Sequence, residues 1–244
     1  MNYKLTISYD GTNYHGWQFQ ENGITVQEVM ENAVSRLLDK KTAVIGCSRT
    51  DAGVHAKRYV CNFHGKSAVP ADKIPIVMNM YLPPDIRVYN CEEADESFNS
   101  RFNALSKTYE YKILNSSVSE PLNRLYTWHF PQRMDVLKMQ EASELIKGEK
   151  DFSSFCAAGS KVKSKVRNLS GLSVLRESDI ITVRATANGF LYNMVRIITG
   201  TLVYVGIGKI KVEELPSLIE NRDRRLLGIT APPCGLMLTE VMYE

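Results

Sequence analysis

The chain has 244 residues, of which 44% are hydrophobic and 23% are charged. This length and apolar content can bury a substantial core, as one large domain or two smaller ones, and they exclude a mostly disordered chain. The formal net charge is only +3. Binding of nucleic acid is therefore permitted, but it must depend on local clusters of Lys and Arg.

The five cysteines are widely scattered and include no Cys-x-x-Cys pair. This arrangement argues against a disulfide framework, so we expect a reducing, cytoplasmic compartment. The N-terminus has no apolar run of the kind found in signal peptides. The longest apolar tract, residues 190–205, contains several polar residues, which favours a buried helix over a membrane span.

The first part of the chain shows clear strand and helix patterns. Residues 3–9 alternate strictly between apolar and polar side chains, which predicts a half-buried strand. Turn-forming residues at 10–13 end it. Thr25 and Glu28 have the spacing of a capping box, and apolar residues at helical spacing follow over 26–38. We expect further strands at 43–45, 59–63 and 86–89 and a short helix between Pro70 and Pro83.

The second part repeats this order of elements. It predicts strands at 107–114, 169–175, 180–187 and 236–242, and helices at 134–147, 190–204 and 212–219. Strand–helix–strand order twice over predicts an α+β fold of two similar halves. Each half is expected to resemble an RNA-recognition motif (RRM), with a mixed or antiparallel sheet backed by helices. We place the two domains at residues 1–103 and 104–244.

The most informative segment is Gly46-Cys47-Ser48-Arg49-Thr50-Asp51-Ala52-Gly53-Val54-His55-Ala56. Arg49 precedes Asp51 by two residues, in a loop between predicted strands. A nearby guanidinium favours the ionised carboxylate and orients it by charge-assisted hydrogen bonds. Such a carboxylate can act as a nucleophile or base. Composition alone favours the alternative, an ordinary surface loop with a structural ion pair.

This loop resembles the signature Gly-Arg-Thr-Asp-Ala-Gly-Val-His-Ala of the tRNA pseudouridine synthase A family, with Ser48 in place of the first Gly. Other segments resemble further motifs of that family, in the same order and over nearly the whole chain. They are residues 9–18, 98–111, 151–155, 189–196 and 224–236.

The resemblance implies a role for each matching residue. Asp51 falls on the catalytic aspartate, which attacks the uridine at the sugar C1′ or at the base so that the glycosidic bond breaks. The base then turns and rejoins through its C5, a redox-neutral isomerisation that needs no cofactor and no metal. Arg49 falls on the arginine that occupies the space left by the flipped nucleotide. Tyr109 falls on the tyrosine that packs against the target base, and Arg196 on the basic residue that pairs with the aspartate.

Physical chemistry bears on two of these roles. An aromatic face can replace the stacking that a flipped base loses, although a tyrosine at 109 on an alternating strand also suits a plain core position. Arg196 lies within an apolar helix, where an arginine is rarely buried unless it is paired. The alternative is a side chain that extends from the helix edge to water.

A run of alternating cations is a candidate for phosphate contacts. In an extended segment, alternate residues project to one side and form a basic stripe. A solvated loop explains the same pattern equally well. The residues of the stripe are Lys161, Lys163, Lys165 and Arg167.

The resemblance further implies a tRNA substrate, modified at uridines 38 to 40 of the anticodon arm. It also implies a homodimer whose second subunit helps to hold the tRNA, and an active cleft between the two halves of each protomer. Two alternatives stay open: a non-catalytic RNA-binding module with an RRM-like sheet, and a metal-dependent hydrolase built on Asp51 and histidines. The four histidines match no compact ligand pattern, so we expect no metal site.

Overall fold

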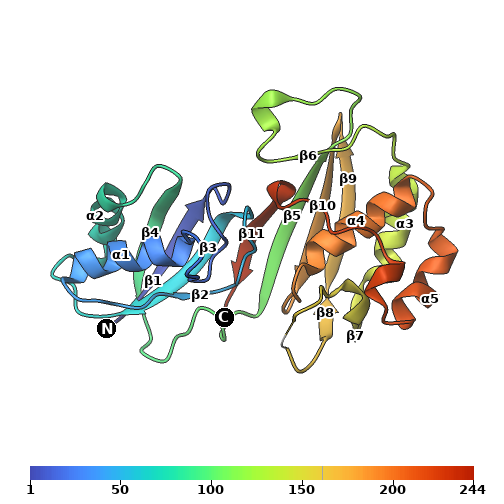
Figure 1. Cartoon of the computed structure of the whole chain (residues 1–244). Coiled ribbons are helices and arrows are strands. Elements are labelled where there is room, and N and C mark those ends of the chain that lie inside the picture. The colour runs from blue at the N-terminus through green and yellow to red at the C-terminus, as the bar shows by residue number, and fades with distance from the viewer. Residues whose placement is uncertain (161) are drawn as a thin grey trace. The chain divides into compact units, whose positions relative to one another are not determined.

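In the computed structural model, which describes residues 1–160 and 162–244, the chain forms two compact units (Figure 1). Unit 1 comprises Met1–Leu105 and Met237–Glu244, and unit 2 comprises Ser106–Leu236. Both combine helices with mainly antiparallel strands, which confirms the predicted mixture of α and β structure. The division at residue 103 into a catalytic-loop half and a base-stacking half stays a prediction.

Unit 1 is built on three antiparallel strands in the order β4–β1–β3. The C-terminal strand β11 runs parallel to β3, and the short strand β2 pairs with β3 as well. Helices α1 and α2 lie across one face of these strands (Figure 1). The bounds are β1 (Asn2–Tyr9), α1 (Val26–Leu38), β2 (Ile45–Gly46), β3 (His55–His64), α2 (Ile74–Tyr81), β4 (Ile86–Ala94) and β11 (Leu236–Met242).

The patterns noted in the sequence explain how unit 1 begins. Tyr3, Leu5, Ile7 and Tyr9 of β1 are all buried, as strict alternation predicts for a strand with one face on a core. The Thr25 hydroxyl accepts the backbone N–H of Glu28 at 3.3 Å, so helix α1 starts at the predicted cap.

Unit 2 contains the antiparallel strands β9–β10–β5, with the short β6 parallel to β5. Helix α3 packs against β9 and α4, α4 packs against β5, and α5 packs against α3. A separate hairpin joins β7 to β8. The bounds are β5 (Ser106–Leu114), β6 (Trp128–His129), α3 (Val136–Ile146), β7 (Gly148–Asp151), β8 (Val166–Leu169), β9 (Gly171–Glu177), β10 (Ile180–Ala187), α4 (Met194–Gly206) and α5 (Leu215–Glu220).

Several predicted boundaries in the chain are wrong. The helix expected from residue 190 begins at Met194, because Asn193 has a left-handed backbone with φ of 59° and cannot continue a right-handed helix. Pro216 does not interrupt α5, because it lies in the first turn, where a missing N–H leaves no bond unmade. Strand β3 starts at His55 rather than at residue 59, and the β7–β8 hairpin was not predicted.

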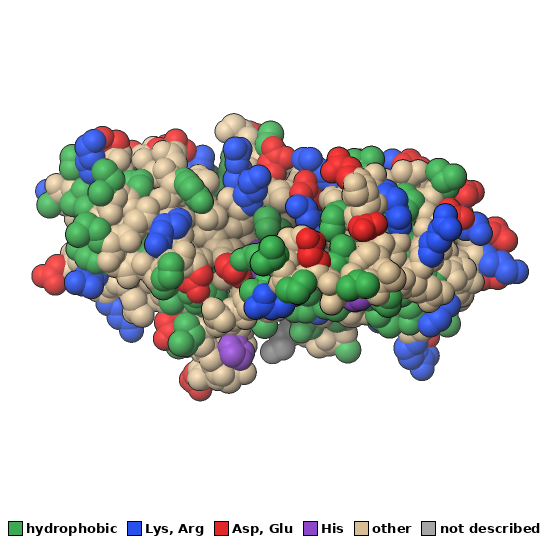
Figure 2. Space-filling view, turned by 90° about the horizontal axis from the view of Figure 1, so that it is seen from above, with side chains coloured by type: hydrophobic (Ala, Val, Ile, Leu, Met, Phe, Trp, Pro, Cys, Tyr) green, Lys and Arg blue, Asp and Glu red, His purple; other side chains and the backbone are tan. Residues whose placement is uncertain are grey.

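Among the described residues, none of the helices combines the length and the apolar character that crossing a membrane requires. On the face drawn in Figure 2, Lys and Arg side chains are interspersed with Asp and Glu rather than gathered into one basic patch. Any RNA contact on that face therefore depends on particular side chains rather than on a broad positive field.

Candidate active site

The loop that carries Asp51 connects β2 to β3, and backbone hydrogen bonds hold it on both sides. Before Asp51, the N–H of Trp17 donates to the carbonyl of Thr50 at 3.1 Å; after it, the N–H of Gly53 donates to the carbonyl of Tyr14 at 3.2 Å. The N–H of Val54 closes the turn on the Asp51 carbonyl, also at 3.2 Å. The backbone position of Asp51 is therefore fixed by the segment that follows β1.

Two glycines allow these segments to approach so closely. A Cβ atom on Gly16 would lie 2.4 Å from the Thr50 carbonyl oxygen, and one on Gly11 would lie 2.0 Å from that of Val54. Gly16 also has a φ of +84°, a conformation that other residues rarely adopt. The backbone of residues 9–18 and the backbone of the loop with Asp51 are therefore packed directly against each other.

Three buried aromatic residues, Tyr9, Trp17 and Tyr59, pack against one another and support the loop that carries Asp51. The Tyr9 hydroxyl lies 2.8 Å from the Thr50 hydroxyl, and Tyr59 stacks on Trp17 with ring centroids 4.2 Å apart. The Tyr59 hydroxyl donates to the Ser48 carbonyl and lies 3.3 Å from the Ser48 N–H, which donates to it. Burial raises the pKa of Tyr59 well above its usual value, so the hydroxyl stays protonated and remains a donor.

The side chains of the predicted pair differ in exposure. Asp51 is half-buried, whereas Arg49 is exposed. Ser48, which departs from the family signature, is not among the described residues with positive φ, so the absence of Gly leaves its backbone unstrained.

His55, considered in the sequence as a metal ligand, instead belongs to the structure of the loop. It is only 2% exposed; its Nδ1 accepts the N–H of Gly11 at 3.0 Å and lies 3.1 Å from a carboxylate oxygen of Asp10. Within residues 1–160 and 162–244, no three or more His, Cys, Asp and Glu side chains are grouped so that they could hold a metal ion.

In unit 2, Tyr109 lies on β5 and is 5% exposed. Its ring lies at 85° to that of the half-buried Phe190, and the two ring centroids are 5.1 Å apart. Two residues further on, the Tyr111 hydroxyl donates to the Pro232 carbonyl at 2.7 Å. Burial raises the pKa of Tyr111, an effect that nearby Cys234 adds to and nearby Arg196 opposes.

Arg196 lies in the first turn of α4, where two acceptors orient its guanidinium. Nε donates to the carbonyl of Ala231 at 2.7 Å, and Nη1 donates to Oδ1 of Asn193 at 2.8 Å. The backbone N–H of Ala231 returns a bond to the Arg196 carbonyl at 3.1 Å. The side chain is thus held in a set direction before any substrate binds.

The described residues of the predicted basic stripe lie between β7 and β8 and in β8 itself. Lys163 is exposed, Lys165 and Arg167 are half-buried, and Lys161 lies outside the described residues. A Cβ atom on Gly189 would lie 3.5 Å from Nε of Arg167, so this cation lies against the residue that precedes Phe190.

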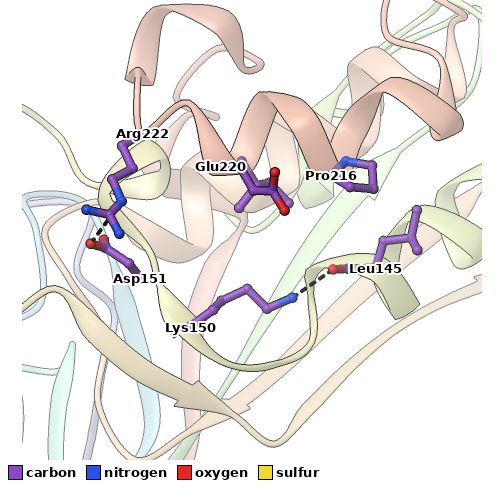
Figure 3. A pocket seen from close by; sticks show the side chains of 7 residues that line it. Leu145, Lys150, Asp151, Pro216, Glu220 and Arg222 are labelled. Atoms are coloured by element: carbon purple, nitrogen blue, oxygen red, sulfur yellow. Dashed lines mark hydrogen bonds and ion pairs between the residues drawn. The ribbon is translucent and has the colours of Figure 1, made fainter.

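Unit 2 also contains a shallow hollow of about 340 Å³ (Figure 3). An ion pair between Arg222 and Asp151, with Nε and Oδ2 3.4 Å apart, lies at one end, and the Lys150 amine donates to the Leu145 carbonyl at 2.9 Å. The Ser153 hydroxyl holds the pKa of Asp151 below its usual value, and Arg222 and Lys165 add to the effect. None of the described residues that line this hollow belongs to the predicted site.

The structure therefore brings Arg49 and Asp51 together on one interlocked loop of unit 1, and it places Tyr109 and Arg196 on β5 and α4 of unit 2. Tyr59 and Trp17 were not predicted as supports of the loop that carries Asp51. Tyr9 and Trp17 belong to the motif at residues 9–18, but Tyr59 carried no signal of its own.

Comparison with known proteins decides the family. The sequence profile of tRNA pseudouridine synthase matches residues 5–103 and 142–244 of this chain. The chain belongs to the tRNA pseudouridine synthase family. The residues that match the family profile include Arg49, Asp51 and Arg196. Tyr109 lies in the segment between the two matched ranges.

Relatives of this family member are similar over their whole length. A protein named tRNA pseudouridine synthase A from Thermoanaerobacter sp. (strain X514) is 44% identical over 242 residues, which cover 99% of each chain. Proteins of the same name from Ruminiclostridium cellulolyticum and Acetivibrio thermocellus are 47% and 46% identical, covering 98% and 99% of each chain.

Proposed function

We propose that this protein converts uridine to pseudouridine in the anticodon stem-loop of tRNA, at uridines 38 to 40, with Asp51 as the attacking group. The observation that carries the proposal is the backbone clamp on Asp51 in a chain of this family: Thr50 and Gly53 bond to Trp17 and Tyr14 on either side of it. A reactive carboxylate needs a fixed position, because correct orientation supplies much of the rate enhancement.

The proposed reaction conserves all atoms and electrons. A carboxylate oxygen of Asp51 attacks the uridine, at C1′ or at the base, and the bond between C1′ and N1 breaks. The base turns, a bond forms between C5 and C1′, and the bond between Asp51 and the uridine breaks, which restores the free carboxylate. The proton on C5 is lost, and N1 gains a proton. Because nothing is oxidised or reduced, no redox cofactor takes part.

We assign the other residues by the same reasoning. Arg49, which is exposed on the loop of Asp51, occupies the space that the flipped nucleotide leaves in the RNA. Tyr109, whose ring lies nearly perpendicular to that of Phe190, packs on the extruded uracil, and such stacking contributes about 1–3 kcal/mol. Arg196, oriented by Ala231 and Asn193, pairs with the Asp51 carboxylate. The proposal thus requires both RRM-like halves to serve one nucleotide in a shared cleft.

The rest of the tRNA is bound by Lys and Arg side chains and by a second subunit. Lys163, Lys165 and Arg167 suit phosphate contacts, since a phosphate-binding Lys or Arg must remain accessible, and Lys163 in particular is exposed. We also propose a homodimer in the cytoplasm in which the partner subunit holds part of the tRNA. Light scattering of the purified protein should then give twice the mass of one chain.

Mapping modified nucleotides tests the proposed function. Unmodified tRNA incubated with the protein should yield pseudouridine at one or more of positions 38 to 40, detected by mass spectrometry. Binding without any pseudouridine would favour the RNA-binding module. Loss of activity in EDTA would favour the metal-dependent hydrolase, whereas full activity in EDTA agrees with the proposal.

A further inference from the structure

Residues 98–105 of unit 1 form a turn that presents an aromatic ring to solvent. The Phe102 side chain is 78% exposed, the largest exposed fraction of any large aromatic residue in the described part of the chain. Exposing such a ring to water is unfavourable, at about 25 cal/mol per Å² of apolar surface. A ring in this position therefore suggests a partner that covers it.

The turn that carries Phe102 is rigid. Asn99 is its centre: its Oδ1 accepts the N–H groups of Arg101 at 3.0 Å and Phe102 at 3.2 Å, and its carbonyl accepts the N–H of Asn103 at 3.0 Å. Oδ1 of Asn103 accepts the Asn99 N–H in return, at 2.7 Å. The exposure of Phe102 is thus a fixed feature of the turn rather than a result of a loose loop.

The same turn is attached to the strand that leads into the catalytic loop. The Ser100 hydroxyl donates to the Ile45 carbonyl at 2.7 Å, its N–H donates to Asn62 at 2.9 Å, and the Tyr243 hydroxyl donates to its carbonyl at 2.6 Å. Ile45 precedes Asp51 by six residues. Six residues span at most about 20 Å, so Asp51 lies within that distance of the residue to which the turn is bonded.

The charge beside the ring indicates the kind of partner. The guanidinium of the exposed Arg101 lies over the Phe102 ring, 5.5 Å from its centroid. A cation next to an open aromatic face suits an RNA base, which stacks on the ring while its phosphate meets the charge. Phe and Arg are also enriched at protein interfaces, but the membership of this chain in a tRNA pseudouridine synthase family favours RNA as the occupant.

We propose that Arg101 and Phe102 form a stacking platform for an unpaired base of the tRNA, close along the RNA to the uridine that Asp51 attacks. The inference rests on the proposed function and extends it: the platform holds a neighbouring nucleotide, whereas Tyr109 packs on the reacting one. It acts in binding and positioning, so its loss weakens the tRNA complex without removing the chemistry.

Four variants test the platform by equilibrium binding of an unmodified tRNA transcript. Phe102→Leu keeps an apolar side chain but loses the ring, and it should weaken binding about 5- to 100-fold. Phe102→Tyr and Phe102→Trp keep a ring and should bind within about threefold of wild type. Tyr89→Leu, at another aromatic residue that is 67% exposed, is the matched control and should bind as wild type.

Salt dependence and mass separate base stacking from a purely ionic contact and from a contact between protein copies. Phe102→Leu removes no charge, so the slope of log Kd against log salt should stay as in wild type, whereas Arg101→Gln should reduce it by about one. An anticodon-arm hairpin with one base removed should bind wild type and Phe102→Leu equally, and the position where this occurs identifies the stacked base. Wild-type affinity of Phe102→Leu for the tRNA would overturn the inference. A change in the mass of Phe102→Leu in solution would also overturn it, because the ring would then belong to a contact between protein copies.

The same tRNA samples, assayed for pseudouridine, distinguish failure of this inference from failure of the proposed function. Pseudouridine from wild type together with undiminished binding by Phe102→Leu refutes only the platform. Weakened binding by Phe102→Leu without product from wild type refutes the isomerase and keeps the RNA contact.

Discussion

The Tyr9 hydroxyl lies 2.8 Å from the hydroxyl of Thr50, the residue immediately before Asp51. Tyr9 ends β1 and Thr50 lies in the loop before β3, so this buried contact joins the first motif of the chain to the second. Together with the bonds from Trp17 and Gly53, it makes the position of the proposed nucleophile depend on residues 9–18. Substitutions of the buried residues that support this loop should therefore reduce activity, even though these residues cannot contact RNA.

Tyr59→Phe should destabilise the protein by about 1–3 kcal/mol, because it removes both hydrogen bonds between the buried Tyr59 hydroxyl and the backbone of Ser48. Chemical denaturation measures the change. Tyr3→Phe is the control: Tyr3 is equally buried, but its hydroxyl has only a long contact of 3.6 Å with the sulfur of Met1, so the loss should be below about 0.5 kcal/mol. Equal losses in the two variants would show that the bond to Ser48 is unimportant.

Gly16→Ala and Gly159→Ala form a second matched pair. Both glycines have a φ of +84°, but a Cβ atom meets the Thr50 carbonyl at Gly16 and nothing within 4 Å at Gly159. The conformational cost common to both is about 1–2 kcal/mol. Overlap with the backbone at Gly16 should add about 1–3 kcal/mol. Pseudouridine formation should fall only in Gly16→Ala; similar stability in both variants would contradict the close approach.

Arg196→Lys should lower kcat at least about 100-fold while the Kd for tRNA stays within about threefold. A lysine cannot reproduce a guanidinium fork that bonds Ala231 and Asn193 and still presents a fixed charge. Single-turnover kinetics at saturating protein separates the two quantities. A variant that loses affinity but keeps kcat would assign Arg196 to tRNA binding instead.

Asn193→Gly gives a milder test of the same arrangement. Glycine accepts the left-handed backbone at this position, so the fold should persist while the bond to Nη1 of Arg196 is lost. We expect kcat to fall about 3- to 10-fold. An unchanged kcat would show that Ala231 alone suffices to orient the guanidinium.

The contribution of Asp151 to stability should depend on pH. Its pKa is lowered in the folded protein, first by the Ser153 hydroxyl. A carboxyl whose folded pKa is depressed stabilises the fold above its ordinary pKa of 3.8 and loses that contribution as the pH falls through the folded pKa. The difference in unfolding free energy between wild type and Asp151→Asn should therefore be constant above about pH 5 and shrink at lower pH.

Two further variants identify the cause of that shift. Ser153→Ala removes the largest influence on Asp151, and Arg222→Gln removes a smaller one. Ser153→Ala should therefore weaken the acid dependence more than Arg222→Gln does. The opposite order would mean that the ion pair with Arg222 dominates.

Much of the fold was predictable where one local cause determines the structure. The alternation over residues 3–9 and the cap at Thr25 needed no knowledge of distant contacts, and both predictions are confirmed. The start of α4 was not predictable in this way. The chain is turned at Asn193 while the neighbouring Tyr192 carbonyl accepts the distant N–H of Ala157, and no local pattern encodes that bond.

The same distinction holds for the site. Arg49 and Asp51 are close in the sequence, so a motif revealed them. The support under their loop comes from residues 9–18 and from Tyr59, which the fold alone brings together. Hydrogen bonds between such segments depend on register, which composition does not specify.

The most direct test compares wild type with Asp51→Asn on unmodified tRNA, measuring both pseudouridine by mass spectrometry and the Kd for the tRNA. The substitution preserves the shape of the side chain and removes its charge. The proposal predicts that pseudouridine formation falls at least about 1,000-fold while the Kd stays within about threefold of wild type. Formation of pseudouridine by Asp51→Asn at the wild-type rate would contradict the assignment of Asp51 as the catalytic carboxylate.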